Sequence, residues 1–330
     1  MQIRKVTFFI LGKVLKMATL LFALSLISFW LLSHSPVDPV QAYIGADMMQ
    51  VSPEQRERIA AYWGLDKSMP EQFWLWFTSV IKGDLGTSMI FRSPVSSVIA
   101  ERFTASFALM AIAWLVSGFV GFSLGVVAAM KQRTWMDRVI KWYCLTLAST
   151  PTFWFGLLLL IVFSVWLGWF PVGLGVPAGT LAEDVTLFDR GWHLILPALT
   201  LSVVGVANVA LHTRQKLVGV LESDFIHFAK ARGEKGFSLF WRHGLRNVAM
   251  PAISLHFASL GGLFGGAVLA EQVFSYPGLG QATVQAGLQG DIPLLLGVVL
   301  FSAIFVFVGN LIADLLYHVI DPRMRNERMV

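Results

Sequence analysis

Residues 223–251, SDFIHFAKARGEKGFSLFWRHGLRNVAMP, form the stretch that decides how the rest of the chain is organised. It is the longest strongly charged run between apolar segments. Gly233 divides it into two pieces suited to short helices, because glycine permits the turn that separates them. A charged loop of this kind is poor material for an active site and offers a good surface to a soluble partner. We therefore expect a docking loop between two membrane spans.

The composition places this loop in a membrane protein. Hydrophobic residues make up 56% of the 330 residues and charged residues only 14%, which is far too apolar for an ordinary soluble domain. A helix needs about 20 apolar residues to cross the bilayer core. The long uncharged windows are 103–130, 142–182, 191–213, 247–270 and 292–313.

The predicted fold is all-α and polytopic, with six transmembrane helices and with both termini in the cytoplasm. The expected spans are about 8–32, 103–130, 139–168, 193–213, 250–270 and 292–318. Basic residues gather in the loops that this order places inside, as the positive-inside rule requires. A cleaved signal peptide is the alternative for the first span, but residues 33–36, SHSP, are a poor cleavage site. Pro151 predicts a kink or a short break in the third span.

The chain is predicted to have three parts. Residues 1–100 hold the first span and a structured outer segment, 101–320 hold a five-helix core with a loop at about 215–250, and 321–330 form an inside tail. In the outer segment, Ser52 and Gln55 predict a capped helix that starts at Pro53. A second, amphipathic helix is expected around residues 73–77, at the membrane interface.

Motifs for catalysis and metal binding are absent from the sequence. It has no Gly-x-x-x-x-Gly-Lys-Ser/Thr loop to hold nucleotide phosphates, no His-Glu-x-x-His zinc motif and no Gly-x-Ser-x-Gly elbow. The single cysteine, Cys144, excludes an internal disulfide and a cysteine-built metal cluster. The net charge of +5 fits the membrane topology and does not imply nucleic acid. We expect no catalytic residue, no metal site and no cofactor on this chain.

Glycines spaced by four mark helix faces that can pack closely in lipid. Packing is the plainer interpretation of these faces, which are also expected to wall a central pathway. For His256, a hydrogen bond to a neighbouring helix is the alternative to a place along a polar path. The predicted pathway and packing residues are Gly121, Gly125, Pro151, His256, Gly261, Gly262, Gly265 and Gly266.

Carboxylates and turn residues near the ends of the last two spans predict structural clamps. Glu271 and Asp314 are the carboxylates nearest the membrane interior, where a charge must be paired or face water. Asp314 shares one helix face with Asn310 and Tyr317. The predicted clamp residues are Glu271, Pro277, Gly278, Gly280, Asp314, Asp321 and Arg323.

Six groups of residues, in order along nearly the whole chain, resemble those of one family. They are Asp38-Pro39 with residues 64–66 and 83–86, then 149–154 with 167–171, then 229–233, then 242–247, then 271–280, and finally 321–323. In these residues the chain resembles the first permease subunit of the dipeptide, oligopeptide and nickel-type ABC importers.

The resemblance implies a type I ABC importer permease fold in a cell inner membrane, without a motor of its own. It implies three kinds of partner besides the lipid bilayer: a second homologous permease subunit in a heterodimer, two ABC ATPase subunits that carry ATP and Mg, and an extracytoplasmic substrate-binding protein. Residues 223–251 resemble the family's EAA coupling loop, and a short helix after Gly233 is expected to transmit ATPase closure. The implied coupling residues are Asp224, Ala229, Lys230, Ala231, Arg232, Gly233, Arg242, His243, Arg246 and Asn247.

The sequence departs from the family pattern where the name of the loop requires Glu-Ala-Ala. His227, Phe228 and Ala229 stand there instead, which leaves open the side chain that faces the ATPase. Short peptides are the implied cargo. Nickel or a metal chelate is the alternative, because His256 and the glycines after it are similar to those of nickel-type members.

Two other classes of protein fit the sequence less well. A stand-alone secondary transporter or channel needs charged or polar residues along its spans, or an inverted repeat. An intramembrane enzyme needs paired catalytic residues at depth. The spans are nearly free of charge, the two halves show no repeat, and no catalytic pair is visible at depth, so an importer permease is the preferred interpretation.

Overall fold

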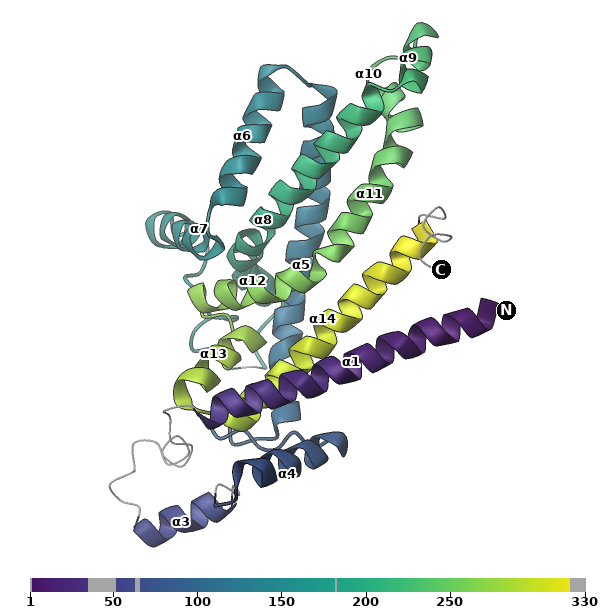
Figure 1. Cartoon of the computed structure of the whole chain (residues 1–330). Helices are drawn as coiled ribbons and strands as arrows, with labels where there is room; N and C mark the ends of the chain where they lie inside the picture. Colours follow the sequence, from purple (N-terminus) through teal and green to yellow (C-terminus); the bar gives the residue numbers. More distant parts are fainter. Residues whose placement is uncertain (1, 35–51, 63–65, 182, 321–330) are drawn as a thin grey trace. The chain divides into compact units, whose positions relative to one another are not determined.

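The computed structural model describes residues 2–34, 52–62, 66–181 and 183–320, and within these ranges the chain is helical (Figure 1). The described residues form no strand beyond one isolated bridge between Thr87 and Pro94. Several predicted residues lie outside the described ranges: Asp38, Pro39, Gly64, Leu65, Asp321, Arg323 and the tail. For Asp314 only the backbone is described, inside a helix.

Four described helices are long and apolar enough to cross a membrane. They contain Gly12–Ser33, Val95–Met130, Leu187–Leu221 and Ile292–Ile312. Two further pairs of helices pass the same test when each is taken as one bent span, which gives up to six spans. The predicted all-helical, multi-spanning fold is therefore confirmed.

The third predicted span is broken at Pro151 rather than kinked. Helix α6 (Trp135–Ser149) ends, α7 (Thr152–Leu159) begins after the proline, and the π-helical segment η2 (Leu160–Trp166) continues it. The second arm is bent by 107° from the direction of the first. The cause is local: Thr150 has an extended backbone with ψ 128°, as expected of a residue before proline, and the proline ring provides no N–H for the helix.

The fifth predicted span, expected as one helix over 250–270, is also divided. Helix α11 (Leu245–Ala258) and helix α12 (Leu260–Val273) meet at Ser259 with a bend of 52°. The Ser259 hydroxyl donates a hydrogen bond of 2.7 Å to the carbonyl of His256, a side-chain bond of the kind that bends helices. Pro251, which is the obvious breaker in the sequence, lies inside α11 without ending it.

The chain forms two compact units, which we describe separately. Unit 1 comprises Met1–Ala105 and Pro277–Phe307, and unit 2 comprises Ser106–Tyr276 and Val308–Val330. Helices α5 (Val95–Met130) and α14 (Ile292–Ile320) each have residues in both units. The first change of unit comes close to residue 100, where the sequence predicts the end of the outer segment.

Unit 1 contains α1 (Gln2–Ser33), α3 (Pro53–Tyr62), α4 (Met69–Ile81) and α13 (Leu279–Gln289). The predicted cap of α3 is present: the Ser52 N–H donates to Gln55 Oε1 at 3.1 Å, and the Gln55 N–H donates to Ser52 Oγ at 3.3 Å. Aromatic rings join α4 to α1, with Phe73 and Phe29 5.4 Å apart in an edge-on contact.

Asp291 is a buried carboxylate of unit 1 that sequence reasoning missed. Its Oδ1 accepts the Leu294 N–H at 3.1 Å, at the start of α14, and its Oδ2 accepts the Ser88 hydroxyl at 2.5 Å and the Ile90 N–H at 3.1 Å. One side chain thus caps a long apolar helix and fixes the loop before α5. Hydrogen bonds of this number offset the cost of burying its charge.

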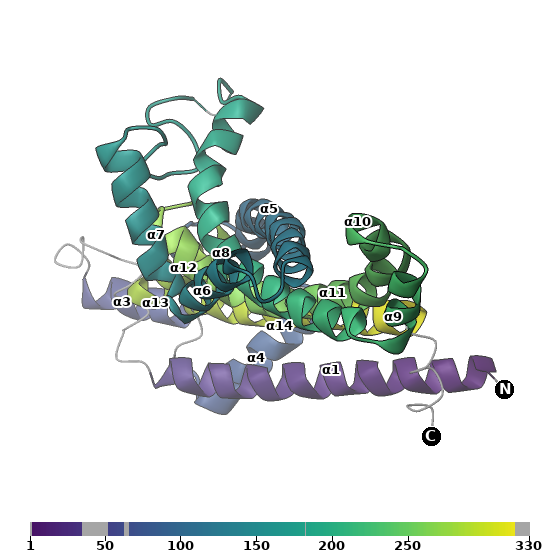
Figure 2. The same ribbon diagram turned by 90° about the horizontal axis from the view of Figure 1, so that it is seen from above.

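Unit 2 is built along helix α8 (Leu187–Leu221), whose described neighbours are α5, α6, α7, α11 and α12 (Figures 1 and 2). At one end of α8 lie the short helices α9 (Asp224–Ala231) and α10 (Gly236–Leu239) and the π-helical segment η3 (Phe240–Gly244). These elements correspond to the charged stretch at 223–251.

Candidate docking and coupling site

Helix α9 is a separate short helix whose ends are set by its sequence. It starts after Ser223, whose backbone is extended, and it ends before Gly233. Gly233 has a φ of +89°, a left-handed conformation that glycine adopts at little cost. Short helices therefore lie on both sides of Gly233, α9 before it and α10 after it, as the sequence predicts. After the glycine, α10, η3 and α11 continue from one to the next. That a helix after Gly233 transmits ATPase closure stays a prediction.

One face of α9 is anchored in an apolar core. Ile226 is fully buried and Ala229 is 6% exposed, and the two are three residues apart, so they share a helix face. Side chains from α8, α10, η3 and α11 complete this core: Leu217, Leu221, Leu239, Phe240 and Val248. Displacement of α9 is therefore resisted by contacts with the end of α8.

Exposed aromatic rings lie on α9, on α10 and in η3. Phe228 is 73% exposed, and Phe225, Phe237 and Trp241 are also exposed. We call these four residues the aromatic surface. Large exposed apolar patches mark sites where a protein binds another protein, a membrane or a ligand. Sequence reasoning assigned docking to the basic residues and missed these rings, although Phe228 stands at a position where the family motif has alanine.

The predicted coupling residues occupy the same stretch of chain as the aromatic surface. Among the predicted coupling residues, Ala229 is buried, His243 is half-buried, and the exposed members are Asp224, Lys230, Ala231, Arg232, Gly233, Arg242, Arg246 and Asn247. Two contacts stabilise the turn itself: His243 Nε2 lies 3.1 Å from Glu234 Oε2, and Asn247 Nδ2 donates to the carbonyl of His243 at 2.8 Å. The exposed charged members are mainly cationic, which suits a partner surface with acidic groups.

The two predicted glycine faces differ in what they meet. A Cβ added to Gly121 would lie 2.8 Å from the carbonyl oxygen of Val206, and one added to Gly125 would lie 2.6 Å from that of Ala210. These glycines therefore let α5 and α8 approach backbone to backbone. In α12, a Cβ at Gly262 or Gly265 would meet no described atom within 4 Å.

The remaining α12 glycines behave differently again. A Cβ at Gly266 would lie 2.9 Å from Leu201. Gly261 lies in the first turn of α12. The glycine-rich face of α12 is therefore not a single packing seam within the described residues.

His256 lies against Trp114 of α5. Their rings stack at 4.3 Å with an angle of 13°, His256 Nε2 donates to the Trp114 carbonyl at 3.0 Å, and Trp114 Nε1 donates to the His256 carbonyl at 3.1 Å. A Cβ at Gly118 would lie 2.6 Å from His256 Nε2, so glycine provides the room for this ring. His256 therefore forms a hydrogen bond to a neighbouring helix, which was the alternative to a place along a polar path. No group of three or more metal-binding side chains occurs among the described residues.

The clamp residues fall in different parts of the chain. Glu271 is fully buried in the last turn of α12, and its Oε1 accepts the Ser106 hydroxyl at 2.5 Å. Its backbone carbonyl accepts the N–H of Tyr276 at 2.9 Å, and burial raises the pKa of the Tyr276 phenol to about 12. In unit 1, Pro277 and Gly278 precede α13, and Gly280 is buried within it.

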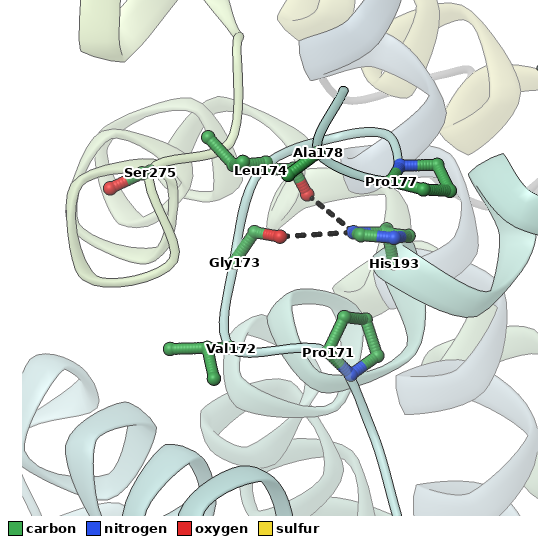
Figure 3. A pocket seen from close by; sticks show the side chains of 8 residues that line it. All are labelled: Pro171, Val172, Gly173, Leu174, Pro177, Ala178, His193 and Ser275. Carbon is green, nitrogen blue, oxygen red and sulfur yellow. Dashed lines mark hydrogen bonds between the residues drawn. The ribbon is translucent and has the colours of Figure 1, made fainter. Parts of the chain in front are cut away.

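A cavity of about 490 Å³ lies at the end of α8 that is remote from α9 (Figure 3). It is lined by Pro171, Val172, Gly173, Leu174, Pro177, Ala178, His193 and Ser275. His193 Nδ1 lies 3.0 Å from the carbonyl oxygens of both Gly173 and Leu174. Two acceptors at this distance require that Nδ1 carries the proton, so His193 acts here as a donor that holds the loop.

The sequence matches one family over most of its length. The family described as binding-protein-dependent transport system inner membrane component matches residues 121–326. A second family, which describes the N-terminal part of such membrane components, matches residues 6–110. The chain belongs to this family. It is a permease subunit, a multi-pass protein of the inner membrane that works with ATPase and substrate-binding components.

Curated relatives match this permease over most of its length. An oligopeptide transport system permease protein of Bacillus subtilis is 34% identical over 96% of this chain and 98% of its own. A glutathione transport system permease protein of Pectobacterium atrosepticum is 38% identical over 79% of this chain and 81% of its own. A putative peptide transport system permease protein of Brucella abortus is 35% identical over 97% of this chain and 99% of its own.

Proposed function

We propose that this permease forms half of the translocation pathway of an ATP-driven importer for short peptides, and that α9 with the aromatic surface is its contact with an ATPase subunit. The complete transporter has a second, homologous permease subunit, two ATPase subunits that bind ATP and Mg, and an external substrate-binding protein. The termini and α9 face the cytoplasm, in a type I importer fold. The observation that carries the proposal is the exposed Phe228 on a helix whose opposite face is locked into the core.

Docking through α9 fits the physical roles of its two faces. Apolar rings supply binding free energy when a partner covers them, and the exposed basic residues of the same loop set the register of the contact. The buried face turns a push on α9 into a push on α8, because Ile226 and Leu217 share one core. ATPase closure would then move α8 as a rigid body, which is the kind of motion that exchanges outward-open and inward-open states.

The cargo is proposed from the relatives, whose names refer to peptides, oligopeptides and glutathione. All three are chains joined by amide bonds, with charged ends and variable side chains. A peptide of this class needs polar contacts at its ends and tolerance between them. Nickel and metal chelates remain the competing cargo in the test below.

The test is uptake by cells or vesicles that contain this chain with all its partner subunits. We expect a labelled dipeptide to accumulate with ATP and radiolabelled Ni²⁺ to remain outside. Gly233→Pro should abolish accumulation, because proline is confined to φ of about −65° and Gly233 requires +89°. Gly236→Ala, at the first residue of α10, is the comparison: its φ of +59° also disfavours alanine, but the change keeps the backbone N–H and does not fix φ as proline does. Uptake of Ni²⁺ without dipeptide would overturn the cargo, and full uptake by Gly233→Pro would overturn the coupling role of the loop.

A further inference from the structure

A bidentate ion pair joins helices α6 and α8 within unit 2. Nε of Arg214 donates to Oδ1 of Asp137 at 2.5 Å, and Nη2 donates to Oδ2 at 2.7 Å. The Asp137 side chain is 2% exposed and that of Arg214 is 22% exposed. Two parallel hydrogen bonds fix the angle between the two groups as well as their distance. Sequence reasoning did not single out either residue, because Asp137 resembles an ordinary acidic residue in the first turn of a helix.

The same carboxylate also holds the connection between α5 and α6. Oδ2 of Asp137 accepts the backbone N–H of Arg133 at 3.1 Å. Arg133 has a φ of +64°, a left-handed conformation that is uncommon outside glycine. Asp137 therefore joins three parts of the chain: the turn that follows α5, the first turn of α6 to which it belongs, and Arg214 near the C-terminal end of α8.

Stability alone is a poor explanation for this pair. Helices α5, α6 and α8 already share an apolar core that includes Cys144, Leu147, Ala207 and Ala210, and Gly121 and Gly125 bring α5 and α8 together. A buried ion pair seldom stabilises a protein more than an apolar pair of the same size. Apolar contacts alone allow two helices to slide along each other. The ion pair adds a fixed register between α6 and α8 along their axes.

The fixed register matters because Arg214 lies close to the core that anchors α9. From Arg214, α8 continues for about two helical turns to Leu221, where it meets the core that anchors α9. A displacement of α9 therefore reaches the end of α8, about two turns from Arg214, through this shared core. If α8 slid along α6 at this point, part of the displacement would be lost.

We propose that Asp137 and Arg214 are positioning residues that lock α8 to α5 and α6, so that a displacement of α9 moves the three helices as one body. The proposal rests on the coupling role of α9 given above. The quantity that tests the proposal is the amount of cargo transported per ATP hydrolysed. If α8 can slide against α6, the ATPase subunits still close and hydrolyse ATP, but less of their movement reaches the transport pathway.

The experiment uses the complete transporter in lipid vesicles, with a labelled dipeptide and with ATP hydrolysis measured in the same sample. We expect Asp137→Asn to lower dipeptide transported per ATP by about tenfold, which is within the usual range of a coupling free energy, while ATP hydrolysis persists. Arg214→Lys keeps the charge but loses the second hydrogen bond, and should give an intermediate ratio. An unchanged ratio in Asp137→Asn would overturn the proposal.

A double replacement separates positioning from packing. Asp137→Leu with Arg214→Met keeps the volume and removes the charges, so the transporter should assemble but should keep the low ratio. A wild-type ratio in this double variant would overturn the proposal, since packing would then suffice. Loss of all three variants from the membrane would also overturn it, because the pair would then serve folding.

The control variant is Asp189→Asn at the other end of α8. Asp189 is a half-buried carboxylate that caps the helix through Thr186, and its loss should leave the ratio unchanged. Phe228→Ala in the same vesicles separates the two proposals. Normal transport by Phe228→Ala would contradict the coupling role of α9 itself. Impaired transport by Phe228→Ala together with a normal ratio in Asp137→Asn would contradict the positioning role alone.

Discussion

Phe228→Ala is expected to reduce ATP-driven uptake strongly while the permease stays in the membrane. Phe228 is 73% exposed on α9, so its removal leaves the fold of unit 2 intact. A large aromatic side chain at the centre of a protein interface contributes about 2 kcal/mol or more to binding, which is about 30-fold in affinity. Weaker docking of the ATPase subunit should appear as lost uptake and as less ATPase subunit purified with the permease.

The matched control for this variant is Phe188→Ala. Phe188 is 74% exposed, in the first turn of α8, far along the chain from α9. Both changes remove the same ring from an exposed helix, so a general effect of lost apolar surface would act on both. We expect Phe188→Ala to retain the ATPase subunit. Equal losses in the two variants would remove the special role that we give to α9.

Gly125→Ala is expected to be the most damaging of the small changes in the membrane-spanning part. The new Cβ would lie 2.6 Å from the Ala210 carbonyl oxygen and 2.7 Å from Thr213 Cβ. The first of these atoms belongs to the backbone of α8, which cannot move aside as a flexible side chain does. Overpacking of this kind costs about 1–3 kcal/mol. The measurement is the thermal stability of the purified permease in detergent, together with its amount in the membrane.

Gly219→Ala provides the comparison within α8. A Cβ at Gly219 would meet nothing within 4 Å, and alanine in a helix is favoured over glycine by about 0.5–1 kcal/mol. We therefore expect stability to be equal or slightly higher in Gly219→Ala and clearly lower in Gly125→Ala. If Gly125→Ala were as stable as the wild type, the close approach of α5 and α8 at this point would be wrong.

The sequence predicts most of the fold because apolar length and charge placement act over whole segments. Pro151 even marks the break in the third span, although its angle of 107° depends on how α7 packs against α8 and α12. The break at Ser259 could not be predicted, because serine is common in membrane helices and its bond to His256 depends on local geometry. Similarly, the glycines of α5 and of α12 have the same spacing, and only the position of α8 makes the first pair a close contact.

The coupling site shows a different limit. The charge pattern and Gly233 locate the loop, since they are local features of the sequence. The exposure of Phe228 depends on which face of α9 the core of α8, α10 and α11 covers. The Asp137–Arg214 pair joins residues 77 positions apart, and no spacing rule connects them. The position of the loop is therefore predictable from its own residues. The exposure of Phe228 and the ion pair are not, because they depend on how separate helices pack together.

Site-directed cross-linking from Phe228 tests the central claim most directly. Cys144→Ala removes the one native thiol, and Phe228→Cys then carries a photoreactive maleimide in the assembled transporter. The account predicts a cross-linked product with an ATPase subunit, identified by mass spectrometry, and none with that subunit when the label is carried by Phe188→Cys. Capture of the ATPase subunit from position 188 and not from position 228 would contradict the claim that α9 is the docking helix.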